Sequence, residues 1–341
     1  MLWFSIATLV PVLLLTLAGV WGGAFCLAAL LYQGAFVHVM DRLVHGAAAR
    51  RGVGGEFPVG EGLAVSLGLA HLLLICLAVY AVGGPSDLSA WERAACFIAF
   101  GLFFGQVSNA NAHELIHKQG RWPRRLGVLV YISLLFGHHA SAHPKVHHIW
   151  VATERDPNSP APNESFYRFW PRAWIGSFRE GLQAENDLRA RAKTDLSIWS
   201  HPYVAYILGA CGMVAGSALL FGWGGIAALL AITCYAQMQL LLSDYVQHYG
   251  LRRKRLETGK FEPVGPEHSW NTPHFYSSAL MLNAPRHSDH HMNPLRTYPS
   301  LQLDEATMPV LPRSLPVMAT LALWPRKWRA VMNPRVAALS T

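Results

Sequence analysis

Long apolar segments alternate with polar ones along the chain. Residues 1–40 contain no Asp, Glu, Lys or Arg, which is too long for one membrane span of about 20 residues. Because Gly22-Gly23 interrupts this segment, we predict a tight hairpin of two helices there. Four further apolar segments have the length that a hydrocarbon core requires. The six predicted spans lie near 2–20, 23–40, 63–82, 94–111, 203–222 and 226–243.

Six spans place the N-terminus and the segments 41–62, 112–202 and 244–341 on one side of the membrane. Of the 28 Lys and Arg, 27 lie on that side, and Arg93 alone lies on the other. Since positively charged loops stay in the cytoplasm, we predict that this side and both termini are cytoplasmic. The sequence thus predicts an all-α integral membrane protein of the inner membrane. It forms one catalytic domain, 1–341, with a cytoplasmic helical cap built from the last two of these segments.

The composition supports a membrane protein and argues against two other classes. Hydrophobic residues make up 52% of the chain and charged residues only 14%, against about 25% charged in ordinary soluble domains. All five cysteines lie in apolar segments without a CxxC pair, so no disulfide framework or thiolate metal site is indicated. The formal charge of +8 comes from loops rather than from a basic stripe with aromatic residues, so we predict no nucleic-acid binding.

Histidines gather in four groups on the predicted cytoplasmic side. Within three of these groups histidines are spaced by four residues, which on a helix directs two imidazoles to one face and so to a common ion. The clustered imidazoles fit two metal ions better than one, although imidazole alone does not select among zinc, copper, iron and nickel. The groups comprise His113 and His117, then His143, His147 and His148, then His248, and finally His287, His290 and His291.

Two other kinds of metal protein are alternatives. His113, Glu114 and His117 match the zinc-protease motif H-E-x-x-H, in which the Glu is the general base. A catalytic zinc needs only three protein ligands, however, and would leave the other histidine groups without a role. The histidines of a metal transporter should line a path across the bilayer instead of collecting at one face.

The ordered motifs resemble those of the membrane alkane 1-monooxygenases, which belong with xylene monooxygenase and the integral-membrane fatty-acid desaturases. The motifs occupy 113–118, 143–157, 248–250 and 286–291, and the resemblance runs from the fourth span to residue 302. The His-Tyr-Gly element and the Arg-His-Ser-Asp-His-His run favour the hydroxylase branch over ordinary desaturases.

The resemblance implies a non-haem diiron centre with nine iron ligands. These are His113, His117, His143, His147, His148, His248, His287, His290 and His291. Candidate acceptors for the outer N–H groups of the ligand imidazoles are the carboxylates of Glu114, Asp156, Asp244 and Asp289. For His138 and His139 we expect a hydrogen-bonding or structural role, although His139 could add a ligand. Structural roles are also expected for His38, His45, His71, His201, His268 and His274, and His71 could line the substrate path.

Three positions depart from the hydroxylase pattern. Ala142 and Gln247 stand where Glu is usual, and Val146 stands where Gly is usual. These changes leave the histidines intact but alter the groups that orient the imidazoles. The motifs therefore indicate metal binding more firmly than they indicate the substrate.

The resemblance implies hydroxylation of the terminal methyl group of a medium- or long-chain alkane to a primary alcohol with O2. Hydroxylation of aromatic or terpene methyl groups, and fatty-acyl desaturation, are the alternatives. The substrate is expected to enter from the membrane lipid. Trp21, Phe36, Phe103 and Phe104 could bound its path, or could pack between helices and face lipid.

The two electrons must come from a separate protein. No dinucleotide-binding glycine motif follows a strand, and no cysteine cluster could hold an electron-transfer centre. The resemblance implies a rubredoxin or ferredoxin-type donor with its reductase. The basic runs 252–255 and 326–329 could steer an acidic carrier, or could anchor the protein to anionic lipid.

Overall fold

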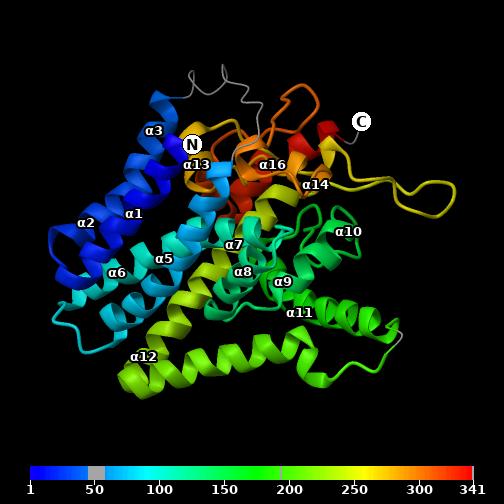
Figure 1. Ribbon diagram of the computed structural model, residues 1–341. Coiled ribbons are helices and arrows are strands. Elements are labelled where there is room, and N and C mark those ends of the chain that lie inside the picture. Colours follow the sequence, from blue (N-terminus) through cyan, green and yellow to red (C-terminus); the bar gives the residue numbers. More distant parts are fainter. Residues whose placement is uncertain (45–57, 193, 340–341) are drawn as a thin grey trace.

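The computed structural model describes residues 1–44, 58–192 and 194–339. His45 and most of the predicted segment 41–62 lie outside this part. Within it the regular structure is helical, and the β-structure is limited to two isolated bridges. Figure 1 shows both termini at one end of the molecule, together with α13, α14 and α16, while the corner of α12 lies at the opposite end. The prediction of an all-α protein is confirmed.

The N-terminal helices form the predicted hairpin. Its elements are α1 (Leu2–Trp21), α2 (Ala24–Leu31), the π-helical η1 (Tyr32–Phe36) and α3 (Val37–Leu43). Gly22 and Gly23 separate the two arms with φ of 64° and 57°, a left-handed conformation that side chains disfavour. The second arm continues through η1 without a break, because consecutive residues keep helical dihedrals.

Three longer helical runs form the centre of the bundle. Their elements are α5 (Pro58–Gly83), α6 (Ala90–Phe103), the π-helical η2 (Phe104–Ser108), α7 (Asn109–Ile116) and α12 (Pro202–His248). The run from α6 to α7 covers the predicted span 94–111. In α12, Gly222 has φ 62° and ψ −150°, which divides it into two helices near the predicted boundary. Four helices of the described chain are long and apolar enough to cross a membrane: Leu2–Trp21, Ala24–Leu43, Gly60–Gly83 and Pro202–His248. The count of six spans stays a prediction.

The polar segments fold into shorter helices. They are α8 (Arg121–Ser133), α9 (His139–Ala142), the π-helical η3 (His143–His147), α10 (His148–Trp150), α11 (Phe166–Ala190), η4 (Ile198–Ser200), η5 (Pro266–His268), α13 (Phe275–Leu280), α14 (His287–Met292), η6 (Tyr298–Ser300), α15 (Leu315–Ala322) and α16 (Pro325–Leu339). Of these, α8 packs against α7, α11 against α9 and α15 against α12. The shorter helices therefore pack against one another and against the long helices.

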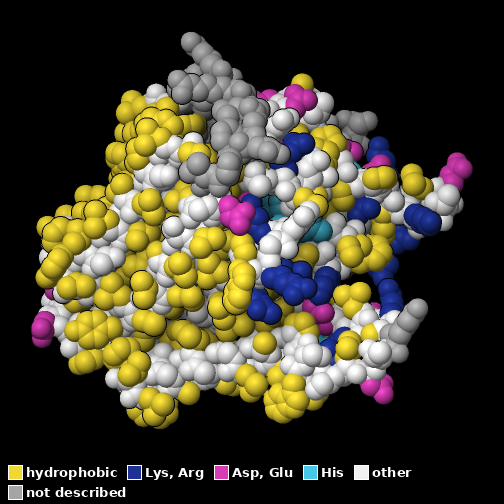
Figure 2. Space-filling view, in the orientation of Figure 1, with side chains coloured by type: hydrophobic (Ala, Val, Ile, Leu, Met, Phe, Trp, Pro, Cys, Tyr) yellow, Lys and Arg dark blue, Asp and Glu magenta, His cyan; other side chains and the backbone are white. Residues whose placement is uncertain are grey.

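Large apolar side chains cover the outside of the long helices. Leu73 is 76% exposed, Leu219 88% and Trp223 85%. Figure 2 shows hydrophobic side chains over most of the half that contains α1, α2, α5 and α6, whereas Lys and Arg gather on the other half. Such a continuous apolar surface is unfavourable in water and favourable in contact with lipid. The protein is therefore an integral membrane protein.

Buried polar side chains join the helices inside the bundle. The two ring nitrogens of His71 on α5 lie 2.9 Å from the hydroxyl oxygens of Ser108 and Ser133. Asn109 donates its amide to the carbonyl oxygen of Ala236 at 3.0 Å. Since helices in a bilayer gain little from the hydrophobic effect, such hydrogen bonds help to fix their positions. His71 is thus structural, as expected.

Gly83 allows α5 to approach α12 closely, and we predict that Gly83→Ala destabilises the bundle. A Cβ atom at Gly83 would overlap the carbonyl oxygen of Gly224, so the helices would have to separate. The expected loss is about 2 kcal/mol, measured as a lower thermal unfolding midpoint in detergent. Gly212→Ala is the matched control, because nothing lies within 4 Å of its Cβ position. Equal midpoints for the two variants would contradict the close approach.

Candidate metal centre

The first histidine pair lies at the end of the run from α6 to α7. His113 is in the last turn of α7, and His117 follows the helix as its C-cap residue. Their ring centroids are 5.1 Å apart, as expected for residues one turn apart. Because the helix continues past its apolar part, both imidazoles lie at the edge of the apolar bundle.

The second group lies on α9, η3 and α10. In η3 the chain makes a π-helical turn, which is wider than an α-turn and common at functional sites. Pro144 at the start of η3 has no N–H group and so needs no acceptor. Residues five apart share one face of a π-turn, and the Nε2 atoms of His143 and His148 accordingly lie 2.9 Å apart, whereas the ring centroids of His147 and His148 lie 6.2 Å apart.

The remaining histidines come from the C-terminal half. His248 is the last residue of α12, and α14 carries His287, His290 and His291. All three histidines of α14 are at most 6% exposed, although the helix has only six residues. A short helix can direct three imidazoles inward because positions i, i+3 and i+4 share one face.

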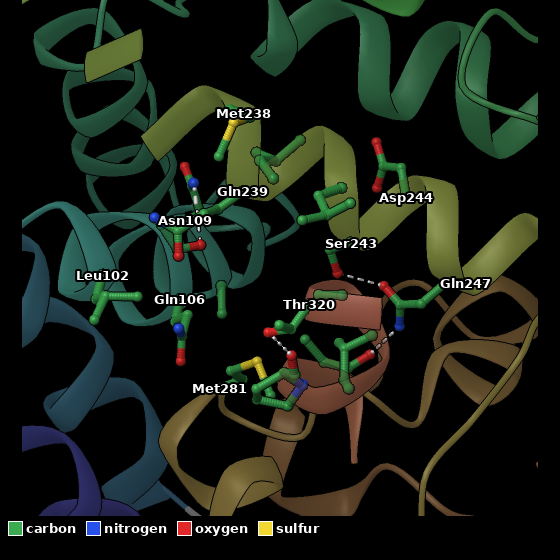
Figure 3. Close-up of a pocket in the computed structure, with 18 of the residues that line it drawn as sticks. Leu102, Gln106, Asn109, Met238, Gln239, Ser243, Asp244, Gln247, Met281 and Thr320 are labelled. Atoms are coloured by element: carbon green, nitrogen blue, oxygen red, sulfur yellow. Dashed lines mark hydrogen bonds between the residues drawn. The ribbon is translucent and has the colours of Figure 1, made fainter. Parts of the chain in front are cut away.

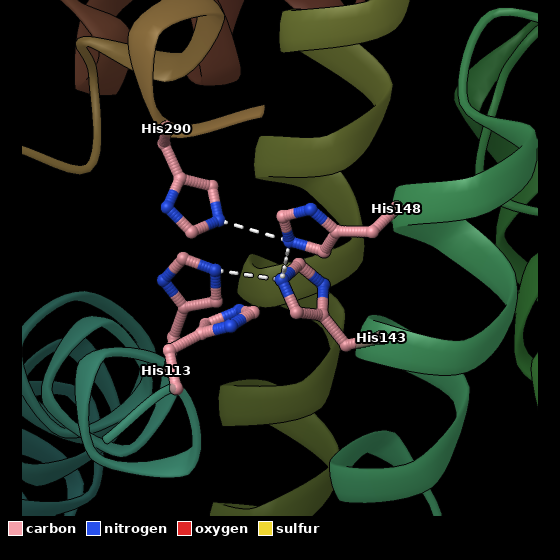
Figure 4. Close-up of side chains that lie close together, drawn as sticks. His113, His143, His148 and His290 are labelled. Atoms are coloured by element: carbon pink, nitrogen blue, oxygen red, sulfur yellow. Dashed lines mark hydrogen bonds between the residues drawn. The ribbon is translucent and has the colours of Figure 1, made fainter. Parts of the chain in front are cut away.

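The nine histidines meet in two groups, within each of which the ligand atoms lie within 4.8 Å of one another. The five-histidine group contains His113, His117, His143, His148 and His290, and the four-histidine group contains His147, His248, His287 and His291. In the first group the Nε2 atom of His143 lies 2.7 Å from that of His113 and 2.9 Å from that of His148 (Figure 4). In the second, the Nε2 atom of His287 lies 3.1 Å from those of His248 and His291.

These spacings fit the shell of a bound metal ion. With metal–nitrogen distances of about 2.1 Å, two ligands at a right angle have their nitrogens about 3.0 Å apart. The Nε2 atoms of His117 and His147 are buried and have no hydrogen-bond partner in the described part of the chain. A buried nitrogen without a partner is costly, and a metal ion would satisfy it. The donor set therefore fits a metal cofactor in each group.

The electrostatics keep most of these imidazoles neutral. Burial, together with the charges of neighbouring histidines, holds the pKa of His113, His143 and His290 well below the ordinary value. Burial lowers the pKa of His117 to about 4. Neutral imidazole is the form that binds metal, so these groups need not lose a proton when a metal binds at neutral pH.

Asp156 orients one histidine of the four-histidine group. Its Oδ2 atom lies 2.8 Å from Nδ1 of His147 and accepts the hydroxyl of Ser159 at 2.6 Å. Burial lowers the pKa of His147, but the charge and hydrogen bond of Asp156 outweigh this and leave that pKa above the ordinary value. A carboxylate on Nδ1 keeps Nε2 free to face a metal. On the same principle, Nδ1 of His248 lies 3.4 Å from the carbonyl oxygen of His268.

The other three candidate carboxylates bind different partners. Glu114 forms an ion pair with Lys118 at 2.7 Å. Asp244 accepts the amide of Asn158 at 2.7 Å. Asp289 accepts the guanidinium of Arg296 at 2.6 Å, and it also accepts the backbone N–H of Gln302. In the described structure these three carboxylates hold loops and helices near the site, and Asp156 is the one that bonds to a ligand candidate.

His138 and His139 lie beside the nine without joining either group. His138 packs edge-on against Phe136, with ring centroids 4.5 Å apart, and is 4% exposed. The ring of His139 lies 5.1 Å from that of His143, and both residues line one cavity. Its Nδ1 atom is buried without a hydrogen-bond partner among the described residues.

A cavity of about 420 Å³ opens beside the histidines, between the second half of α12, the run from α6 to α7, the N-terminal hairpin and α15. His113, His143 and His287 form part of its wall, so it reaches both histidine groups. Figure 3 shows Leu102 and Gln106 on the wall that faces Met281 and Thr320. A cavity of this size is within the usual range for small-molecule sites.

The aromatic residues that the sequence offered as walls of a substrate path do not line this cavity. Trp21 is 67% exposed and Phe36 42%, so both lie on the outer surface. Phe103 and Phe104 are fully buried and pack against each other, with ring centroids 6.1 Å apart. Instead, Leu102, Gln106 and other residues that sequence reasoning missed form the wall. The large hydrophobic side chains of Phe103 and Phe104 indicate core positions, but they do not indicate a cavity.

Comparison with known proteins finds a matching family and several relatives within it. The model of the fatty acid desaturase family matches residues 89–322. Alkane 1-monooxygenase 2 of Alcanivorax borkumensis is 34% identical over 242 residues, which are 71% of this chain and 63% of that protein. Alkane 1-monooxygenase 1 of Pseudomonas aeruginosa is 30% identical over 284 residues, which are 82% of this chain and 74% of that protein.

A more distant relative is the hydroxylase component of xylene/toluene monooxygenase from Pseudomonas putida, 28% identical over 248 residues, covering 71% of this chain and 63% of that protein. The match thus spans less than two thirds of several relatives' length. The resemblance inferred from the histidine motifs is confirmed by these matches. The chain therefore belongs to the fatty acid desaturase family and groups there with the alkane 1-monooxygenases.

Proposed function

We propose that this chain is a non-haem diiron monooxygenase that hydroxylates the terminal methyl group of a hydrophobic substrate. The overall reaction converts R–CH3, O2, two electrons and two protons to R–CH2OH and water. The observation that carries the proposal is the pair of converging imidazole groups at the wall of one cavity. The names of the relatives support an alkane as the substrate.

Two irons are the metals that we propose for the nine histidines. The five-histidine group would hold one and the four-histidine group the other, with Asp156 fixing the orientation of His147. Oxidation of an unactivated C–H bond is beyond the side chains themselves, and the bound metals would supply the activation of O2. A single catalytic zinc would use three ligands and leave six imidazoles unexplained.

The protein's own contribution is to position the substrate and to exclude water. His113, His143 and His287 form the reactive end of the cavity, and apolar residues such as Leu102 and Met281 line its wall. Such a wall holds a hydrocarbon chain with its end against the histidines. Closing the site to water also protects the reaction from side reactions.

The inner membrane with the histidines on the cytoplasmic face is the proposed location. The gathering of Lys and Arg on one half of the molecule supports this orientation through the positive-inside rule (Figure 2). A rubredoxin or ferredoxin-type carrier with its reductase is the proposed electron source. Arg252 and Arg253 follow His248 of the four-histidine group in the chain, and a basic surface there would attract an acidic carrier.

Purified protein is expected to contain two irons per chain, by elemental analysis. His290→Ala and His147→Ala each remove a ligand candidate from a different group, so each should lower the iron content to about one or less. His201→Ala is the control, because this histidine bonds Asn186 and caps α12 away from the site. One zinc and no iron in the wild type would rule out the diiron centre.

Asp156→Asn is expected to weaken metal binding in the four-histidine group while leaving the ligands in place. The loss of a carboxylate that orients a ligand typically costs about 10- to 100-fold in metal affinity or activity. Iron occupancy under limiting iron, measured together with turnover, tests this. Asp187→Asn is the control, since this exposed carboxylate accepts a hydrogen bond from Gln183 on the surface of α11. Equal occupancy in both variants would contradict the role of Asp156.

Product analysis separates the proposed reaction from its alternatives. In membranes supplied with O2 and a reconstituted carrier, we expect an alcohol from octane; benzylic alcohol from xylene or a new double bond in a fatty acyl chain would indicate the alternative reactions. The protease hypothesis requires peptide cleavage that Glu114→Gln abolishes. We expect no cleavage by either form, because the Glu114 carboxylate is paired with Lys118.

A further inference from the structure

The cavity beside the histidines is more polar than a plain hydrocarbon requires. Amide side chains enter its wall from three different elements, namely η1, the run from η2 to α7, and α12. They belong to Gln33, Gln106, Asn109, Gln239 and Gln247. Inside a bilayer each such group is costly unless it has a partner.

Most of these amides are used by the protein itself. Gln33 donates to the carbonyl oxygen of Ala99 at 3.0 Å, and Gln239 donates to that of Gly101 at 2.8 Å. Gln247 donates to Ala284 at 3.1 Å. These hydrogen bonds connect different segments of the protein. The three amides therefore have a structural role and give no indication of a ligand.

Gln106 is different, because its side chain makes no hydrogen bond with the described part of the chain. It lies on η2, and Figure 3 shows its amide directed away from that helix toward the space beside Met281 and Thr320. Gln106 is half-buried, so an apolar ligand that fills the cavity would remove water from its amide without giving it a partner, at a cost of about 1–3 kcal/mol. A bound hydrocarbon would leave this cost in place, whereas a polar group on the substrate would remove it.

Two other lining side chains are buried and hold an unpaired atom. Asp41 is 3% exposed; its Oδ1 atom accepts the backbone N–H groups of Tyr276 and Ser277, while Oδ2 has no partner among the described residues. His139, also 3% exposed, has an unpaired Nδ1 atom. The wall of one cavity thus offers an unpaired amide and an unpaired acceptor.

The charges of the wall restrict what the polar group can be. Among the described residues that line the cavity there is no Lys or Arg, while Asp41 and Asp244 are both present. A carboxylate or phosphate on the substrate would meet like charges without a counter-ion. A hydroxyl group is neutral, and it can accept from an amide N–H and donate to an amide or carboxylate oxygen.

We propose that the substrate is a hydrophobic molecule that already carries a hydroxyl group, which Gln106 binds while the far methyl group faces the histidines. This rests on the proposed function. Gln106 precedes His113 by seven residues, about 10 Å along a helix, which is roughly the length of an eight-carbon chain. The reaction is then HO–R–CH3 + O2 + 2 e⁻ + 2 H⁺ → HO–R–CH2OH + H2O, with both electrons from the separate carrier.

Kinetics with 1-octanol, octane and octanoate test the proposal with the full chain in membranes and one common electron supply. The wild type should form the 1,8-diol from octanol, with kcat/KM about tenfold or more above that for octane and with octanoate the poorest substrate. Gln106→Leu should lower the value for octanol about tenfold and raise it for octane. Met238→Leu is the matched control, because it reshapes the same cavity without changing hydrogen bonding and should alter both substrates by one factor.

The possible outcomes distinguish this inference from the proposed function. If the wild type converts octane at least as well as octanol, or if Gln106→Leu changes both equally, the hydroxyl site is wrong and the monooxygenase stands. A preference for octanoate would also overturn it. If no substrate is oxidised by iron-loaded protein, the proposed function falls and this inference falls with it. Gln106→Leu removes no hydrogen bond to the described part of the chain, so unchanged iron content and unfolding midpoint serve as its check of folding.

Discussion

The convergence of nine imidazoles at one edge of the bundle is the constraint on which the other features depend. Seven of them bring their Nε2 atoms to between 2.7 and 3.1 Å of a neighbour, and burial keeps most of the nine neutral. Without a shared ligand, so many buried polar rings would be a large cost to folding. The segments that carry them come from 113 to 291 in the sequence, so the fold must bring four distant stretches to one place. A metal ion in each group would offset this cost, which would couple metal binding to folding.

The long helices supply much of that placement. α7 and α12 continue past their apolar parts, which puts His113 and His248 at the same end of the bundle. Close helix contacts without side chains, as at Gly83 and Gly224, fix the distance between α5 and α12. Polar bridges such as the one from His71 to Ser108 and Ser133 fix α5 against the run that carries the first histidines. A precise site can then rest on rigid elements instead of loops.

The sequence indicated the nine histidines but not how they divide into two groups. Spacing by four residues and the motif resemblance predicted the nine histidines as ligands, and all nine converge. His143 and His147, however, are four residues apart and lie in different groups. The division into five and four was not readable, since the π-helical η3 places His143 in one group with His148, five residues on, and His147 in the other group. The cavity was missed for a related reason. The large side chains of Phe103 and Phe104 were predicted to bound the substrate path, but both are core residues. The direction of the Gln106 side chain, which does line the cavity, depends on η2 and on its neighbours.

The departures from the hydroxylase pattern have physical counterparts in the packing. Ala142 lies against Gly181 of α11, where an added Cβ atom would lie 3.1 Å from the Cβ atom of Ala142, so α9 and α11 pack closely at this position. From the same helix α11, the buried Glu185 accepts the hydroxyl of Ser141 at 2.5 Å and the ammonium of Lys145. The carboxylate that supports α9 and η3 thus comes from a neighbouring helix. Gln247 donates to the carbonyl oxygen of Ala284 just before α14, which an ionised Glu could not do. The surroundings of the histidines are rebuilt while the imidazoles remain, and this is the arrangement in which a related site would accept a different substrate.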